Sequence, residues 1–154
     1  MRLVPFFTGQ SADTATLVAR VTAARVAHRI EVEAALRAIT EASTAACRAL
    51  SAPVGVQATA LLGALALAAV ATDRLATAAG VELVPGCVTD ARQALRRFGG
   101  VVKTTGAGGG DVAVAVVPAA ADEAAVRAAL DENGCQILEL RVDDRGVDLR
   151  PDAS

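Results

Sequence analysis

The sequence predicts an α+β fold, a two-layer sandwich with helices on one face of a small, mainly antiparallel sheet. A short apolar strand opens the chain, and a long stretch of helical periodicity follows without Gly or Pro. Two valine-rich runs flank a short glycine-rich link, and short links favour antiparallel pairing. Strands and helices are therefore segregated along the chain rather than alternating, which is typical of two-layer α+β domains.

Length and composition set the limits of the fold. With 154 residues, the chain is expected to form one domain over residues 1–150, with 151–154 as a frayed tail. Hydrophobic residues make up 53% and aromatic residues 2%, so we expect a folded core built from Leu, Val, Ile and Ala. The net charge of −2 and the scarcity of aromatics argue against nucleic-acid binding.

Cysteine usage and hydropathy indicate a cytoplasmic protein without a metal site. The three cysteines are widely spaced and there is a single histidine, so the ligand set of a zinc site is missing. No signal-peptide pattern opens the chain. The most apolar run, 58–71, has 14 residues, and a bilayer span needs about 20. We therefore interpret that run as a buried helix and expect no membrane partner.

The first half predicts a strand and a long helix. Residues 2–7 predict a short strand, and a turn leads to a helix from Thr14 to about Leu50, capped by Ser11 or Asp13. This helix is continuous or divided into two nearly continuous pieces. His28 falls on its apolar seam, where a core role is the main interpretation and a substrate contact the minor one.

The middle of the chain predicts two more helices. One runs from Gln57 to Ala79 and stops at Gly80. A loop follows, and then a short helix through Phe98, capped by Thr89 or Asp90. Its three arginines are interpreted as a solvated face, with an anion or an acidic partner surface as the alternative: Arg92, Arg96 and Arg97.

The last third predicts the rest of the sheet. Strands are expected over 101–104 and 112–117, on either side of the glycine loop. A helix from Asp122 to about Asn133 follows, then a strand over 136–142 and a possible return strand over 147–149.

The glycine loop is the main candidate for chemistry. Gly106, Gly108, Gly109 and Gly110 fall within five residues, directly after the positive charge of Lys103. Successive amides in such a loop can turn inward and bind an anion such as phosphate. A ligand-free hairpin loop is the alternative. The loop lacks both the Walker pattern and the dinucleotide-binding pattern, because position 111 is aspartate.

Two segments resemble motifs of the GHMP small-molecule kinases. Residues 99–111 read GGVVKTTGAGGGD, similar to the third motif of that family in its phosphomevalonate kinase version. Residues 7–18 read FTGQSADTATLV and resemble the segment that opens the C-terminal half of those kinases. Phe7 stands in place of a tryptophan, Asp13 in place of a serine, and Val112 in place of a cysteine. A carboxylate at position 13 would repel a phosphorylated substrate unless a cation intervened.

The resemblance implies the C-terminal half of an ATP-dependent kinase acting on phosphomevalonate, mevalonate or another small alcohol or phosphate. It implies ATP with Mg²⁺, shared with an N-terminal half that supplies the nucleotide loop and the catalytic groups. No catalytic residue and no metal ligand is therefore assigned in this chain. Phosphate and substrate binding would fall to twelve residues: Lys103, Thr104, Thr105, Gly106, Ala107, Gly108, Gly109, Gly110, Asp111, Thr8, Gly9 and Thr14.

Each of these roles also has a purely structural alternative. Thr8, Gly9 and Thr14 also fit an ordinary strand-to-helix turn with a hydroxyl cap. Asp111 is expected to orient the loop by accepting backbone amides, with proximity to a metal as the alternative. For the whole chain, the alternative is a non-catalytic binding or assembly module, in which homodimerisation covers the face that a kinase half would cover.

Overall fold

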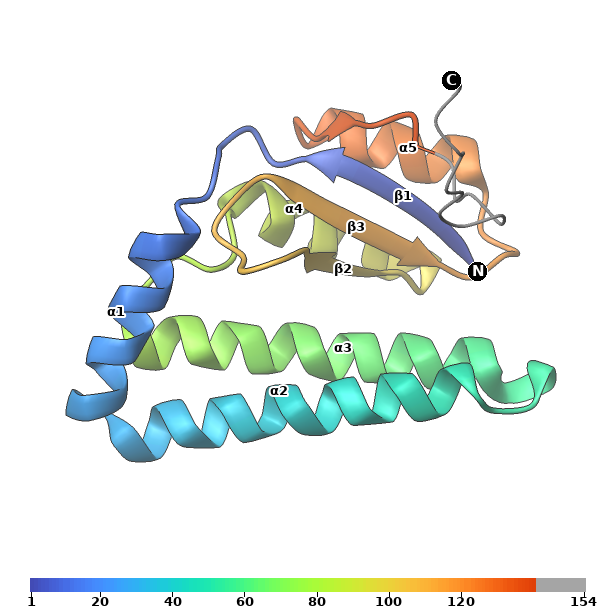
Figure 1. The fold of residues 1–154 in the computed structure, drawn as a ribbon. Coiled ribbons are helices and arrows are strands. Elements are labelled where there is room, and N and C mark those ends of the chain that lie inside the picture. The colour runs from blue at the N-terminus through green and yellow to red at the C-terminus, as the bar shows by residue number, and fades with distance from the viewer. Residues whose placement is uncertain (141–154) are drawn as a thin grey trace, which may run out of the picture.

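The structure is a computed structural model that describes residues 1–140. Ten elements follow in order: β1 (Arg2–Phe7), α1 (Thr14–Ala27), α2 (Arg29–Leu50), α3 (Val54–Ala79), α4 (Gly86–Leu95), a 3₁₀ turn (Arg96–Phe98), β2 (Val101–Thr104), β3 (Val112–Val117), α5 (Glu123–Glu132) and β4 (Gln136–Ile137). Figure 1 shows the sheet with α4 and α5 behind it and the α2–α3 hairpin running alongside. The α+β prediction is confirmed.

The four strands form one antiparallel sheet in the order β2-β3-β1-β4. Alternation along each strand sends one set of side chains toward α4 and α5. This face builds the main core with the helix residues that meet it: Val4, Phe6, Val102, Ala113, Ala115 and Val117 from the strands, Val88, Ala91 and Leu95 from α4, and Val126, Ala129 and Leu130 from α5. The glycine loop lies at one end of this sheet, between β2 and β3.

An alanine seam joins α2 to α3. The buried positions Ala35, Ala42 and Ala49 on α2 and Ala64, Ala68 and Ala71 on α3 recur at three- and four-residue multiples, as expected for two helices packed side by side. Small side chains let the helix backbones approach closely, which explains how an alanine-rich chain makes a core with few aromatics.

The long first helix is divided at His28. The backbone leaves the helical region there, with φ −127° and ψ 50°, and the chain turns so that α1 packs on the loop after α3 while α2 follows α3. The side chain is exposed. The prediction that His28 is a core residue is therefore wrong, because the turn rotates it out of the apolar seam.

Helix boundaries and burial also differ from the predictions. α3 begins at Val54, before the predicted Gln57, and α4 begins at Gly86 after Pro85 rather than at a Thr89 or Asp90 cap. α3 is not a buried helix: 22% of its most apolar window is buried. Among the described residues, α3 is the one helix long and apolar enough to cross a membrane, a test that core helices of soluble proteins also pass.

β4 is shorter than predicted within the described residues. It spans Gln136–Ile137, where the sequence predicts a strand over 136–142. Part of that strand, the possible return strand over 147–149 and the tail over 151–154 lie outside the described residues.

Candidate functional site

Three loops meet at one end of the sheet: residues 8–13 after β1, residues 81–84 after α3, and residues 105–111 between β2 and β3. The amide of Asp111 donates to the carbonyl of Gln10 at 2.7 Å, and the amide of Thr8 donates to the carbonyl of Asp111 at 2.8 Å. The amide of Gly109 donates to the carbonyl of Leu83 at 2.8 Å. The glycine loop is thus the central member of a hydrogen-bonded cluster.

The missing side chains of the glycines permit this contact. A Cβ at Gly108 would lie 2.6 Å from the carbonyl oxygen of Leu83, and a Cβ at Gly110 would lie 2.7 Å from the carbonyl oxygen of Gln10. Neither backbone oxygen can move away without breaking the cluster. Part of the glycine pattern therefore reflects backbone packing rather than ligand contact.

The loop has fewer free amides than the sequence suggests. The amides of Thr105, Gly108, Gly109 and Asp111 are already bonded to backbone carbonyls. The exposed tip, Gly106 and Ala107, differs: within residues 1–140 the structure gives its amides no protein acceptor. The amide of Gly110 likewise has no acceptor among the described residues, but Gly110 is buried. The expected cradle is therefore limited to the exposed residues Gly106 and Ala107, because the other loop amides are buried or already bonded to the protein.

Of the four predicted threonines, two are buried and two are exposed. Thr104 is 3% exposed and shares the core face of β2 with Val102, so it does not face the solvent. Thr105 is exposed and its Oγ1 donates to the carbonyl of Val112 at 2.8 Å. Thr8 is also buried, and its Oγ1 donates to the carbonyl of Gln10 at 3.2 Å. Thr14 is exposed as the first residue of α1. Hydroxyls open to a ligand are those of Thr105 and Thr14.

Lys103 lies half-buried on β2, beside a second cation. Its Nζ donates to the carbonyl of Thr104 at 2.9 Å. Burial, and next the nearby Arg92 guanidinium, lower the pKa of Lys103 below its usual value. An anion bound nearby would favour the charged form of Lys103 and so counteract the lowering of its pKa.

Arg92 is a structural residue that sequence reasoning interpreted as solvated surface. Its Nε donates to the carbonyl of Val102 at 2.9 Å, and its Nη1 donates to both carboxylate oxygens of Asp73 at 2.7 and 2.9 Å. One side chain from α4 therefore ties the β2 edge to α3. An arginine 19 residues after an aspartate is no recognisable sequence signal.

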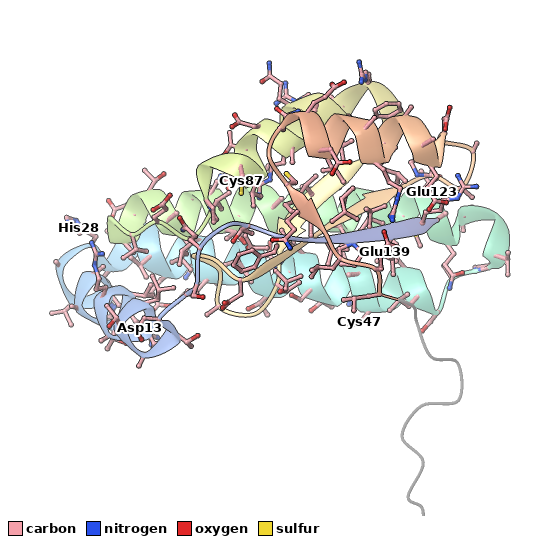
Figure 2. The ribbon with its side chains drawn as sticks, turned by 90° about the horizontal axis from the view of Figure 1, so that it is seen from above. Asp13, His28, Cys47, Cys87, Glu123 and Glu139 are labelled. Atoms are coloured by element: carbon pink, nitrogen blue, oxygen red, sulfur yellow. The ribbon has the colours of Figure 1, made fainter. Side chains whose placement is uncertain are left out.

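Two carboxylates border the loop cluster. Asp13 caps α1: it accepts from the Thr16 hydroxyl and amide, and these hydrogen bonds lower its pKa. Figure 2 shows Asp13 at the α1 end of the molecule, remote from Glu123 and Glu139. Asp111 adopts a left-handed φ of 56°, and its Oδ2 accepts from the amide of Ala12 at 3.4 Å. That contact agrees with a loop-orienting role for Asp111.

Two further side chains support the cluster without having been singled out from the sequence. Gln10 donates its Nε2 to the carbonyl of Gly109 at 2.8 Å. Cys87 donates its Sγ to the carbonyl of Thr8 at 3.1 Å, and burial raises the pKa of this thiol. Within the described residues, no group of three His, Cys, Asp or Glu side chains is placed to hold a metal ion.

The chain matches a known protein family. The family model described as "GHMP kinases C terminal" matches residues 22–134, which include the glycine loop but not residues 7–18. No curated protein sequence matches significantly.

Solved structures share the fold. The Lin0012 protein of Listeria innocua superposes with a TM-score of 0.78 at 18% identity, over 89% of this chain and 38% of that one. Streptococcus pneumoniae phosphomevalonate kinase, in complex with phosphomevalonate and AMPPNP, gives 0.69 at 16% identity, over 88% and 37%. L. major mevalonate kinase, in complex with R-mevalonate, gives 0.63 at 23% identity, over 85% and 36%. This chain thus spans little more than a third of each matched structure.

Proposed function

The chain belongs to the GHMP kinase family through its C-terminal domain, and from this membership we propose that it forms part of an ATP-dependent small-molecule kinase. The observation that best supports this proposal is the anchored glycine loop, which lies inside the segment that the family model matches. At its exposed tip, the loop holds the amides of Gly106 and Ala107. Phosphoryl transfer depends mainly on positioning and charge stabilisation, and a fixed amide tip supplies both to a phosphate oxygen.

The substrate class proposed is a small alcohol or phosphate of the phosphomevalonate type. The fold shared with structures that hold phosphomevalonate with AMPPNP, and R-mevalonate, supports this class. The exposed tip of the loop and the hydroxyls of Thr105 and Thr14 are the groups available to contact it. Gly9 lies in the adjoining turn and shapes it through a left-handed φ of 84°.

A second half is required for catalysis in this proposal. The phosphomevalonate kinase and mevalonate kinase structures are more than twice as long as this chain, and we assign the catalytic groups to the part they have in addition. ATP would bring Mg²⁺, whose ligands we likewise place on the nucleotide and on that other half. Asp13 and Asp111 border the site as carboxylates, so the cation also offsets their repulsion of a phosphate.

The test combines the chain with the half that supplies the nucleotide loop, in one polypeptide or two. ATP consumption is measured with phosphomevalonate, mevalonate and other small alcohols. Phosphorylation of one of these substrates is expected. A complex that forms but consumes no ATP with any candidate would overturn the proposal.

A binding experiment addresses Lys103 separately. Lys103→Met should abolish phosphomevalonate or ADP binding to the complex by calorimetric titration, because the variant loses the positive charge beside the loop. Arg97→Met, which removes an exposed arginine from the 3₁₀ turn, is the control and should bind normally. Unchanged affinity in Lys103→Met would show that the loop acts without this charge.

The same variant carries a pH signature. The folded-state pKa of Lys103 lies below the value of 10.5 for the unfolded chain, so between these two pH values the unfolded state binds more protons than the folded state. In that pH window, the contribution of Lys103 to the free energy of unfolding rises with pH. Lys103→Met should therefore stabilise the chain near neutral pH, and the difference should shrink toward pH 10.5. Urea titrations across this range measure it, and a larger gap at high pH would contradict it.

The alternative, a non-catalytic assembly module, is favoured by one observation: large apolar side chains of α3, among them Leu67 and Val70, are exposed in this chain. A stable homodimer that binds neither ADP nor phosphomevalonate, alone or with a second half, would support it over the kinase.

A further inference from the structure

Gln10 forms hydrogen bonds on both sides of Gly110 in the glycine loop. Its side-chain Nε2 donates to the carbonyl of Gly109 at 2.8 Å, and its own carbonyl accepts from the amide of Asp111 at 2.7 Å. The hydroxyl of Thr8 donates to the same Gln10 carbonyl at 3.2 Å, which ties Gln10 into the turn after β1. One residue of that turn thus binds two successive peptide units of the loop.

The Gln10 side chain holds the peptide unit between Gly109 and Gly110. This peptide is trans, so the carbonyl of Gly109 and the amide of Gly110 point in opposite directions. The carbonyl faces Gln10, and the Gly110 amide therefore points away from it. Within residues 1–140, the Gln10 side chain is the single donor to that carbonyl.

Glycine on both sides makes this peptide unit easy to reverse. A reversal rotates ψ of Gly109 and φ of Gly110 by about 180°, and glycine reaches positive and negative φ at similar cost. The bonds from the Gly109 amide to Leu83 and from the Asp111 amide to the Gln10 carbonyl would survive, because those donors belong to neighbouring peptide units. The bond from Gln10 Nε2 is the one that a reversal breaks.

We propose that Gln10 is a positioning residue for the glycine loop, whose side-chain amide fixes the direction of the Gly109–Gly110 peptide. In the fixed direction an N–H group points away from Gln10, and in the reversed direction a carbonyl oxygen takes its place. Inward N–H groups favour an anion such as phosphate, whereas a carbonyl oxygen opposes it. The effect on a substrate rests on the proposed kinase function, but the direction of the peptide does not.

The chemistry of a glutamine side chain suits this role. Gln10 is exposed, so its amide is not needed to fill the core. A glutamine amide carries two N–H donors, and an ionised glutamate of the same size can only accept. Leucine is close in size and has no donor. These two replacements therefore separate the hydrogen bond from the volume of the side chain.

The first test follows the Gly110 amide signal of the full ¹⁵N-labelled chain by NMR. The wild type should give one sharp signal, and Gln10→Leu should broaden or double it, because the peptide then samples both directions. Gln93→Leu is the matched control: Gln93 is an exposed glutamine of α4 without a side-chain hydrogen bond among the described residues, and this variant should match the wild type. An unchanged Gly110 signal in Gln10→Leu would overturn the proposal.

A pH titration of Gln10→Glu separates the hydrogen bond from a merely structural role. At pH 7 the introduced carboxylate has no donor for the Gly109 carbonyl, so the variant should behave like Gln10→Leu. As the pH falls from about 6 to 4, toward the ordinary glutamate pKa of about 4.3, the neutral carboxyl gains an O–H donor and should restore the wild-type signal. The carboxylates of Asp13, Glu82 and Asp111 lie on the same loops and also titrate, so the wild type is recorded at each pH. Failure of acid to restore the signal would contradict the proposed bond.

The consequence for the substrate is measured in the complex with the second kinase half. Gln10→Leu should lower kcat/KM for phosphomevalonate about tenfold, an effect in the range of one lost hydrogen bond. Gln93→Leu should match the wild type. An unchanged kcat/KM in Gln10→Leu would overturn the link between peptide direction and substrate. If the wild-type complex is inactive, the proposed kinase function fails, and the Gly110 signals still decide the role of Gln10.

Discussion

Gly106 and Gly108 stand two residues apart in one loop but have different structural roles. Both have left-handed φ values, 58° and 81°. Only Gly108 lies against a neighbouring backbone, where an added Cβ would meet the Leu83 carbonyl at 2.6 Å, while Gly106 has open space. The left-handed backbone restricts both positions, and the close approach restricts one.

This difference predicts a graded effect on stability. Gly106→Ala should cost about 1–2 kcal/mol of unfolding free energy, the usual penalty for a side chain in left-handed backbone. Gly108→Ala should cost about 1–3 kcal/mol more, because the methyl group overpacks the loop against a backbone oxygen. Urea denaturation measures both, and equal losses would contradict the role given to Gly108.

At the scale of elements, one polar side chain links α3 to the sheet in addition to the direct packing of α3 on β2. Arg92 reaches from α4 to the Val102 carbonyl of the edge strand β2 and to the Asp73 carboxylate of α3. The Arg92 side chain is 18% exposed, so water replaces these contacts poorly. Its Nη2 is buried without a partner among the described residues, which offsets part of the gain.

Arg92→Ala should therefore lower the free energy of unfolding by about 1–3 kcal/mol. Arg96→Ala removes an exposed arginine of the adjacent turn and should change it by less than about 0.5 kcal/mol. Chemical denaturation followed by circular dichroism compares the two. If they behave alike, Arg92 is ordinary surface, as its sequence context alone suggested.

At the scale of the whole molecule, the loop cluster and the exposed side chains of α3 lie apart. The proposed kinase function depends on the loop cluster at one end of the sheet. Figure 1 shows α3 running the length of the molecule below the sheet, so most of its exposed side chains lie away from that end.

Homodimerisation, the alternative to the kinase function, predicts a melting temperature that depends on protein concentration, because association stabilises the folded state by mass action. The wild type should then melt at a higher temperature when its concentration is raised about a hundredfold. Differential scanning fluorimetry is the measurement. A wild-type melting temperature independent of concentration would count against the homodimer.

The sequence by itself determined the α+β class, the order of the elements and the location of the glycine loop. These properties follow from local signals: helical and strand periodicity, glycine and proline stops, and a short motif carried on consecutive residues. The resemblance to the GHMP kinases rested on the same contiguous residues, and the family model confirms it.

Only the tertiary structure decided which loop groups are free, where His28 lies and what Arg92 does. Each of these depends on partners far away in the chain: the loop amides are taken up by residues 10 and 83, and Arg92 binds Asp73. The exposure of α3 is of the same kind. Its composition predicts burial, but burial requires a neighbour on every side, and a sequence pattern does not say how many sides of a helix its own chain covers.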